Sequence, residues 1–321
     1  MLAVEWEHQA CLKDTQVNIN SEFEIIKKYL SGIGASYLDS SSVELAGGDD
    51  CAVLAPKSKL LISTDTSVVG VHFLKTMPPQ AIAYRAVSTA LSDIAAMGGA
   101  PTAFNLSLSM PSLDSTWMKA FSNGLVKISK EHKIPLVGGD LVKGPLQISV
   151  TVFGRPGQNI LLRSGAMPGD ILCLSDALGK AYVGLRTYKS SPLINAKTRP
   201  YLFPKAQVEY AQAISLHASS AIDISDGILQ DLSHLIGQSS VGCELDIAKI
   251  PVADSHFHKQ CLEFGDDYQL LFTVPPNKLD LLERKIKSLG KQCHTIGVMK
   301  GARLKILNNP FKNIKNWDHF R

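Results

Sequence analysis

The chain has 321 residues, of which 45% are hydrophobic, so it can bury a large core and is expected to form two domains. Its formal net charge of +4 is too small to indicate nucleic-acid binding, and no run of about 18 apolar residues could cross a membrane. Its six cysteines are scattered without a C-x-x-C pair, which argues against a zinc site or a disulfide framework and favours reduced thiols in a cytoplasmic protein.

The N-terminal half is predicted to alternate short strands with long helices. Residues 1–20 lack the apolar segment of a secretory signal, and we expect them to form a loosely ordered N-terminal extension. Pro78-Pro79 is expected to open a helix that ends at Gly98-Gly99, because proline suits the first turn of a helix and glycine its end. The other elements predicted here are strands at 59–64, 103–110, 134–137 and 146–153 and a helix at 117–130.

The segment 154–158 is the expected boundary between an N-terminal domain, 21–154, and a C-terminal domain, 155–321. Beyond it, strands are predicted at 170–175, 241–247, 268–274 and 293–298, and helices from residue 178 and at 204–216 and 226–238. The last helix carries an apolar stripe at Ile228, Leu229, Leu232, Leu235 and Ile236. This alternation of strands and helices indicates an α/β (α+β) protein.

Short aspartate motifs follow the ends of hydrophobic stretches. They are Gly48-Asp49-Asp50, Ser63-Thr64-Asp65-Thr66, Leu91-Ser92-Asp93, Gly138-Gly139-Asp140, Asp223-Ile224-Ser225-Asp226-Gly227 and Gly265-Asp266-Asp267. Two carboxylates 4 Å apart repel by roughly 4 kcal/mol at an effective dielectric constant near 20, so such crowding indicates bound cations. Hard oxygen ligands select Mg²⁺ or Ca²⁺, and several such ions favour a polyphosphate ligand.

The motifs of several common enzyme classes are absent. The chain has no G-x-x-x-x-G-K-[ST], G-x-G-x-x-G, G-x-S-x-G or H-E-x-x-H sequence. These absences argue against four classes of enzyme: P-loop kinases, dinucleotide-binding enzymes, serine esterases and zincins.

Each candidate residue also has a structural interpretation when it is taken alone. Asp93 and Asp226 could cap helices, and Asp140 could stabilise a turn through its own backbone. Asp231 is expected on the polar surface of its helix, and a lone histidine such as His72 is usually structural or solvated. Independent turns would not all supply aspartate beside glycine and hydroxyl groups, so the motifs together favour a metal–phosphate site.

In their order and spacing, these motifs resemble those of the thiamine-monophosphate kinase family. The motifs that point to this family are Ser63-Thr64-Asp65-Thr66 with Gly70-Val71-His72-Phe73, and Leu91-Ser92-Asp93-Ile94-Ala95-Ala96-Met97-Gly98. The similarity runs from about Ser21 to Trp317-Asp318-His319-Phe320. The wider superfamily includes aminoimidazole ribonucleotide synthetase and selenophosphate synthetase.

The resemblance implies a two-domain aminoimidazole ribonucleotide synthetase-like fold in which N-terminal strands form a barrel across a homodimer. It implies transfer of the ATP γ-phosphoryl group to thiamine monophosphate, with several Mg²⁺ ions held by Asp50, Ser63, Thr64, Asp65, Asp93, Asp140, Asp223 and Asp226. The aspartates expected to act in catalysis are Asp50, Asp65, Asp93, Asp140 and Asp226. ATP contacts are expected from Gly139, Asp140, Arg163 and Ser225, and acceptor contacts from His72, Asp266 and Trp317. Without the resemblance, Trp317 would be interpreted as a packing residue.

The chain departs from the family pattern at two of these motifs. Lys143 stands in place of an arginine, and lysine supplies charge without a bidentate fork. Asp266 stands in place of a glutamate and is one methylene shorter. Two other interpretations stay open: a superfamily enzyme that phosphorylates another small acceptor, and an inert binder of nucleotide or thiamine phosphate.

Overall fold

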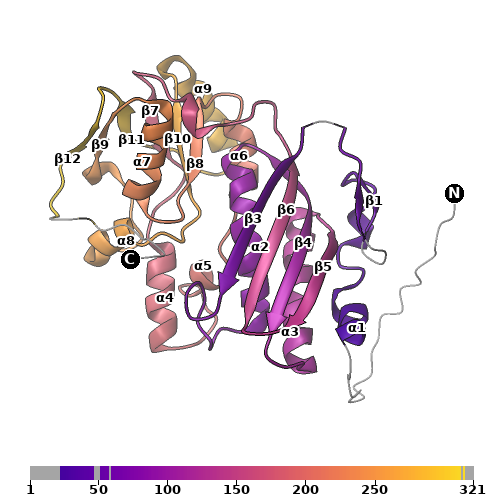
Figure 1. The fold of residues 1–321 in the computed structure, drawn as a ribbon. Helices are drawn as coiled ribbons and strands as arrows, with labels where there is room; N and C mark the ends of the chain where they lie inside the picture. The colour runs from indigo at the N-terminus through magenta and orange to yellow at the C-terminus, as the bar shows by residue number, and fades with distance from the viewer. Residues whose placement is uncertain (1–21, 47–50, 58, 312–313, 315–321) are drawn as a thin grey trace.

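The computed structural model describes residues 22–46, 51–57, 59–311 and 314, and it is a two-part α/β structure with one large sheet in each part (Figure 1). The described chain begins with the short helices α1 (Glu22–Ile25), η1 (Ile26–Leu30) and η2 (Ala35–Tyr37). Strands β1 (Val43–Leu45) and β2 (Val53–Leu54) then pair antiparallel. This N-terminal segment lies along one edge of the first large sheet (Figure 1).

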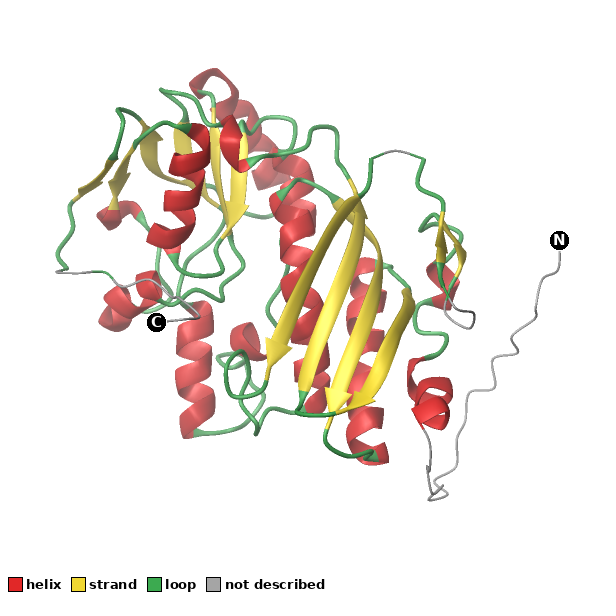
Figure 2. Cartoon of the chain, viewed as in Figure 1, coloured by secondary structure: helices red, strands yellow, loops and turns green. Residues whose placement is uncertain are grey.

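The first large sheet has four strands in the order β3-β6-β4-β5. They are β3 (Leu61–Val68), β4 (Ala100–Met110), β5 (Leu136–Lys143) and β6 (Gln147–Arg155). Helices α2 (Pro79–Ala96) and α3 (Ser115–His132) cover one face, and Figure 2 shows no described helix over the other face. In β6 the buried side chains alternate along the strand, as predicted, because successive residues point to opposite faces.

The second sheet has six strands in the order β12-β9-β11-β7-β10-β8. They are β7 (Ile171–Leu174), β8 (Ser220–Asp223), β9 (Cys243–Asp246), β10 (Leu270–Val274), β11 (His294–Met299) and β12 (Leu304–Leu307). The helices of this part are α4 (Lys180–Ser190), α5 (Arg199–Leu202), α6 (Val208–Ile214), α7 (Ile228–Ser239), α8 (His258–Glu263) and α9 (Pro276–Ser288). Short 3₁₀ turns lie at Arg163–Gly165, Ile247–Lys249 and Ser255–Phe257.

Helix α2 joins the two parts. It is buried along almost its whole length, and it contacts β3 and β6 of the first sheet as well as β8, α5 and α6. Ser88 Oγ donates to the Pro204 carbonyl oxygen at 2.7 Å, and the Tyr84 and Phe203 rings meet edge to face at 5.4 Å. The boundary at 154–158 stays a prediction. No helix within the described part of the chain is long and apolar enough to cross a membrane.

Two strands extend further than the sequence predicts. β3 continues to Val68 and β5 to Lys143, so Asp65 and Asp140 lie inside strands and not beyond their ends. Their partners explain the difference. β3 pairs with β6 as far as Val68 opposite Gln147, and β5 pairs with β4 as far as Lys143 opposite Met110. Ladder hydrogen bonds of this kind override the local turn preference of glycine and aspartate.

Candidate active site

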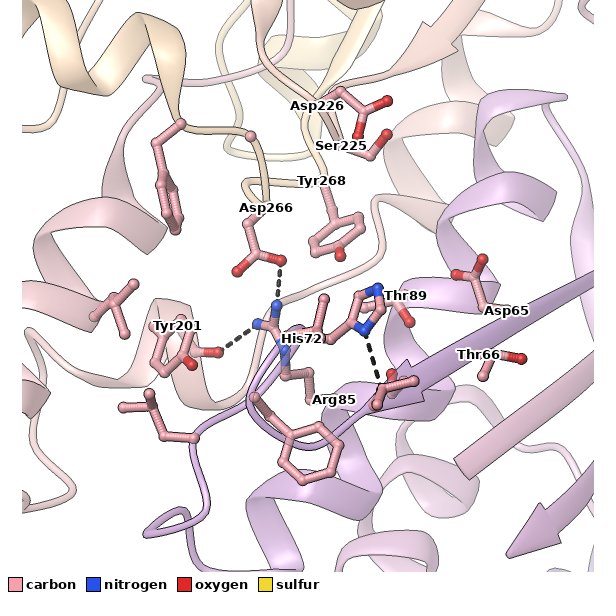
Figure 3. Close-up of a pocket in the computed structure, with 18 of the residues that line it drawn as sticks. Asp65, Thr66, His72, Arg85, Thr89, Tyr201, Ser225, Asp226, Asp266 and Tyr268 are labelled. Atoms are coloured by element: carbon pink, nitrogen blue, oxygen red, sulfur yellow. Dashed lines mark hydrogen bonds and ion pairs between the residues drawn. The ribbon is translucent and has the colours of Figure 1, made fainter. Parts of the chain in front are cut away.

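A cavity of about 880 Å³ lies where α2 and the end of the first sheet meet the loops of the second part (Figure 3). Its wall comes from β3 and the loop after it, α2, α4, α5, the β8–α7 loop and the loop before β10. Seven residues predicted from the sequence line it: Asp65, His72, Asp93, Asp223, Ser225, Asp226 and Asp266. Residues as far apart in the chain as Asp65 and Tyr268 therefore meet at one site.

Asp65 and Asp93 form the part of the site shared by β3 and α2. Burial raises the pKa of Asp65 to about 6, the charge of Asp93 adds to the rise, and a hydrogen bond with Thr89 opposes it. Burial also raises the pKa of Asp93, while hydrogen bonding to the Ser63 hydroxyl opposes that rise. Asp93 lies within α2, and its carboxylate accepts a hydrogen bond from the Ser63 hydroxyl. It therefore lines the cavity and does not cap the helix.

Asp223, the last residue of strand β8, lies next to this pair. Only 5% of its surface is exposed, and the Ser92 hydroxyl donates to its Oδ2 at 2.7 Å. Burial raises the pKa of Asp223 to about 7, and the charges of Asp93 and Asp65 add to the rise. Asp93 raises the pKa of both Asp65 and Asp223, so the three carboxylates share an electrostatic environment that favours either protons or a bound cation.

Asp231 corrects one expectation from the sequence. It was expected on the surface, but it is 2% exposed, and its Oδ2 accepts hydrogen bonds from the backbone N–H groups of Ser225, Asp226 and Gly227 at 3.1, 3.2 and 3.2 Å. Asp231 therefore stabilises the first turn of α7 by accepting these N–H groups. The N-cap residue of the helix is Gly227, which has no side chain, and the Asp226 side chain does not act as a cap. The Asp226 side chain is left to line the cavity (Figure 3). A D-G-x-x-x-D spacing is the sequence signal that could have revealed this role.

The hydroxyls around Asp65 divide between the two faces of the sheet. Ser63 lies on the same face as Asp65, beside α2. Thr64 lies on the other face, where its Oγ1 is 2.9 Å from Thr151 Oγ1. The structure thus brings the Ser63 hydroxyl together with the aspartates and directs the Thr64 hydroxyl away from them.

Gly139 and Asp140 lie in a different cavity, of about 510 Å³, at the opposite edge of the sheet. Two strands separate β3 from β5, which places Asp65 and Asp140 roughly 14 Å apart at the usual strand spacing. Gly139 is required here, because a Cβ at this position would lie 1.8 Å from the Leu106 carbonyl oxygen. Within one chain, Asp140 is therefore not brought to the Asp65 cluster.

Of three other predicted site residues, one lies near the aspartate cluster and two lie outside the described part of the chain. Arg163 lies in its 3₁₀ turn, and its charge acts against the burial that raises the pKa of Asp93 and Asp223. Asp50 and Trp317 lie outside the described residues.

His72 and Asp266 also line the cavity, and the His72 ring lies between the Asp266–Arg85 pair and Asp65 (Figure 3). The Val68 N–H donates to His72 Nδ1 at 3.0 Å, so a neutral His72 carries its proton on Nε2. Asp266 forms an ion pair with Arg85, a buried residue of α2 that also lines the cavity. The sequence analysis missed Arg85, although it is the only basic residue in the mainly apolar stretch from Ala81 to Ala96, which was a signal for it.

The donor set suits a hard divalent cation. The groups that meet are carboxylates and a serine hydroxyl, which are oxygen ligands of the kind that Mg²⁺ accepts. Within the described part of the chain, no three acidic, histidine or cysteine side chains converge closely enough to hold an ion by themselves. This arrangement fits Mg²⁺ that takes one or two carboxylates from the protein and further oxygens from a bound phosphate.

Two family models match the chain in order. The model described as "AIR synthase related protein, N-terminal domain" matches residues 48–155, and its C-terminal counterpart matches residues 168–307. The thiamine-monophosphate kinase of Buchnera aphidicola subsp. Schizaphis graminum is 35% identical over 94% of this chain and 99% of its own length. That of Escherichia coli K12 is 37% identical over 87% of this chain and 90% of its own.

Solved structures share the fold. The crystal structure of thiamine-monophosphate kinase from Stenotrophomonas maltophilia K279a has a TM-score of 0.80 and 30% identity, covering 89% of this chain and 96% of that one. The structure of AaThiL complexed with AMPPCP and TMP has a TM-score of 0.73 and 28% identity, covering 93% of this chain and 97% of that one. The similarity therefore spans both parts of the molecule.

Proposed function

The chain belongs to the thiamine-monophosphate kinase branch of the AIR synthase related family and is a kinase, and on this premise we propose that it transfers the γ-phosphoryl group of ATP to thiamine monophosphate. The products are thiamine diphosphate and ADP, and the proposed site of action is the cytoplasm. The observation that carries the proposal is the meeting of Asp65, Asp93, Asp223 and Asp226 in one cavity. A similar structure in complex with AMPPCP and TMP supports it.

The chemistry of the reaction suits this set of side chains. The acceptor is a phosphate monoester that is already ionised near neutral pH, so the reaction does not require a strong general base. Its main obstacle is the repulsion between two anionic phosphates. Mg²⁺ bound by the aspartates would neutralise that charge and favour direct in-line transfer. The chain's own task is to align donor and acceptor and to exclude water from the cavity.

In this proposal Asp65, Asp93, Asp223 and Asp226 hold Mg²⁺ and the Ser63 hydroxyl assists them. The burial of Asp65, Asp93 and Asp223, which raises the pKa of each, and the position of Asp226 in the same cavity support this assignment. Ser225, which lies in the loop directly after Asp223, is proposed to contact ATP, and Arg163 supplies positive charge near the cluster. The assignments of Asp50, Thr64 and Trp317 rest on the family resemblance.

We also propose that the protein works as a homodimer in which the edge strand β5 of one subunit meets the edge strand β3 of the other. Both strands are unpaired on their outer sides among the described strands. The helix-free face of this sheet exposes apolar groups at both edges, with Ile62 59% and Val142 44% exposed. Closing the two sheets into a barrel would cover this face and pair the edges. It would also bring Gly139 and Asp140 of one subunit towards the Asp65 cluster of the other.

The decisive test is product formation by the purified protein with ATP, Mg²⁺ and thiamine monophosphate, run beside free thiamine as the alternative acceptor. We expect thiamine diphosphate from the monophosphate only, and no product after addition of EDTA. Binding of thiamine monophosphate without turnover would identify an inert binder. Turnover with a different acceptor would identify another member of the superfamily.

A further inference from the structure

Arg85 is a buried cation in the wall of the cavity. It lies in the middle of α2, and only 4% of its surface is exposed. Burying a guanidinium group is costly unless its donors are paired. Its Nη2 pairs with the Asp266 carboxylate, its Nη1 donates to the Tyr201 carbonyl oxygen at 2.7 Å, and its Cζ lies 5.0 Å from the centre of the Tyr201 ring. Two separate segments, those of Asp266 and Tyr201, therefore satisfy this one side chain.

The loop that carries Asp266 is held in an unusual conformation. Asp266 and Tyr268 have φ angles of 68° and 51°, a left-handed region that side-chain-bearing residues seldom adopt. The Asp266 N–H donates to the Ser225 carbonyl oxygen at 2.8 Å, and a Cβ at Gly265 would lie 1.7 Å from that oxygen. Strained residues persist where the surroundings fix them, and such places are often functional sites.

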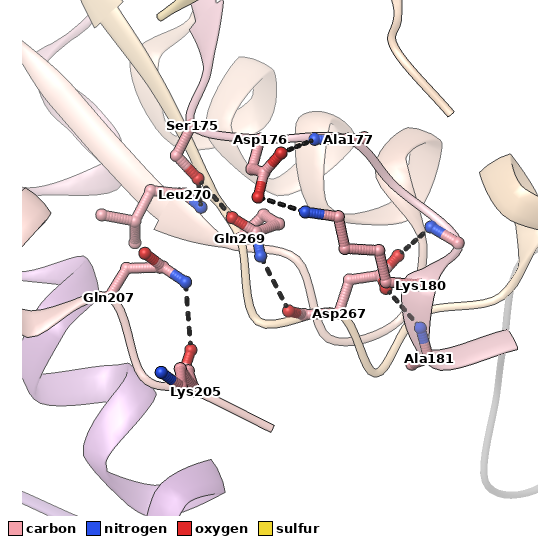
Figure 4. A network of polar contacts seen from close by, with 11 residues as sticks. Ser175, Asp176, Ala177, Lys180, Ala181, Lys205, Gln207, Asp267, Gln269 and Leu270 are labelled. Carbon is pink, nitrogen blue, oxygen red and sulfur yellow. Dashed lines mark hydrogen bonds and ion pairs between the residues drawn. The ribbon is translucent and has the colours of Figure 1, made fainter. Parts of the chain in front are cut away.

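The loop sends its two neighbouring carboxylates in different directions. Asp267 is 7% exposed, and its carboxylate accepts from the backbone N–H groups of Gly179 and Ala181 at the start of α4 (Figure 4). Asp266 instead reaches the cavity, where 17% of its side chain is exposed. Asp267 thus fixes the loop, and the Arg85 ion pair fixes the position of the Asp266 carboxylate.

The fork of Arg85 is already committed to protein groups. Because Arg85 is only 4% exposed and its Nη1 and Nη2 contact Tyr201 and Asp266, it is poorly placed to bind a phosphate directly. The ion pair uses Oδ1 of Asp266, the same carboxylate forms a side-chain hydrogen bond with Tyr268, and Asp266 lines the cavity. Figure 3 shows Arg85, Asp266 and Tyr201 on one side of the cavity, away from Asp65 and Asp226.

We propose that Arg85 is a positioning residue for the phosphoryl acceptor, because it holds Asp266 so that the carboxylate faces the end of the cavity that lies away from the aspartate cluster. This inference rests on the proposed function. The acceptor carries a cationic thiazolium ring and an amino-substituted pyrimidine ring, and both suit a fixed carboxylate among aromatic and apolar side chains. Leu74, Leu185, Tyr201 and Phe264 supply those side chains in the same cavity.

The test compares Arg85→Gln, Arg85→Lys, Asp266→Asn and the double variant Arg85→Gln with Asp266→Asn. We expect Arg85→Gln to raise the KM for thiamine monophosphate about tenfold while kcat and the KM for ATP stay within about twofold. Arg85→Lys should recover part of the loss, because it keeps the charge but not the fork. Since both residues act through one contact, the double variant should be no worse than either single variant.

Ser88→Ala is the matched control. Ser88 lies one turn along α2 from Arg85 and also bonds the segment after α5, through the Pro204 carbonyl oxygen, but it does not line the cavity. We expect it to lower Tm without changing the KM for thiamine monophosphate. If Arg85→Gln behaves in the same way, or raises both KM values equally, Arg85 has only a structural role.

Two further outcomes are decisive. Additive effects of the Arg85 and Asp266 substitutions would show that they act independently and would overturn the inference. If Arg85→Gln does not fold, an unchanged KM for thiamine monophosphate in Arg85→Lys and Asp266→Asn would do so as well. A wild-type protein that forms no thiamine diphosphate contradicts the proposed function itself. In that case the Kd for thiamine monophosphate is compared, and a value unaffected by Arg85→Lys overturns the positioning role.

Discussion

At the residue scale, the aspartates of this chain divide by what their carboxylates touch. Asp231 and Asp267 accept backbone N–H groups and hold loops in place. Asp65 and Asp226 line the cavity and have no such structural task. A short sequence motif shows that an aspartate is present but not which of the two tasks it has.

The cavity aspartates are expected to be essential for turnover. Asp65→Asn or Asp226→Asn removes a charge from the proposed Mg²⁺ site and should lower kcat by about a thousandfold or more. The far-ultraviolet circular dichroism spectrum and Tm should stay close to those of the wild type. Asp280→Asn on the exposed side of α9 is the control and should be fully active. Near-normal turnover in either cavity variant would refute the metal-site assignment.

Asp267 is expected to make stability depend on pH. Burial raises its pKa from 3.8 to about 7, against the hydrogen bonds from Ala181 and Gly179. The folded state therefore holds this proton more tightly than the unfolded state, so the contribution to stability is complete below about pH 4 and is lost as the pH rises through about 7. Between pH 5 and 8, Asp267 should lower the free energy of unfolding by roughly 2 kcal/mol.

Urea unfolding of the wild type and of Asp267→Asn across this range measures the effect. The asparagine variant loses one acceptor at every pH, but it should lack the decline that the wild type shows between pH 5 and 8. Subtracting the two curves removes the contribution of the histidines, which both proteins share. Parallel curves would show that Asp267 is already ionised at pH 5.

At the scale of elements, helix α2 organises the site. It places Asp93, Ser92 and Arg85 beside the first sheet, the β8 strand and α5 respectively. Small residues allow this close packing. Gly124 of α3 shows how close it is, because a Cβ there would lie 2.2 Å from the Gln80 carbonyl oxygen of α2.

Two helical glycines should therefore respond to alanine with opposite signs. Gly124→Ala should lower the free energy of unfolding by about 1–3 kcal/mol, because the new methyl group forces α2 and α3 apart. Gly237→Ala in α7 has nothing within 4 Å and should raise it by up to about 1 kcal/mol through helix propensity alone. Chemical denaturation of both variants provides the comparison. Equal effects would show that the α2–α3 contact is less close than the structure has it.

At the scale of the whole molecule, the unpaired edges of the described sheet and the distance between Asp140 and Asp65 suggest an active site shared between two subunits, which can be tested. If each site takes Asp65 from one subunit and Asp140 from the other, Asp65→Asn and Asp140→Asn proteins are each inactive. Mixed dimers then contain one site with both substitutions and one with neither. Refolding an equal mixture should restore about a quarter of wild-type activity, because half of the dimers are mixed and each has one intact site. A site built within one subunit would restore none.

Much of the fold could be predicted from the sequence. The strand at 146–153, the helix after Pro78 and the helix near 228–238 follow from apolar periodicity and the positions of proline and glycine, and β6, α2 and α7 confirm them. The predicted C-terminal ends of β3 and β5 were wrong by several residues. Their length depends on hydrogen bonds to β6 and β4, which lie far away in the sequence.

The sequence by itself determined which residue types this protein has for its chemistry: short carboxylates and hydroxyls in family-specific motifs, without the motifs of other enzyme classes. Only the tertiary structure decided which of them meet. It joined Asp65, Asp93, Asp223 and Asp226, placed Asp140 at the other sheet edge, buried Asp231, and set Arg85 against Asp266. The physical reason is that a carboxylate's role depends on its burial and its donors, and packing between distant segments supplies both.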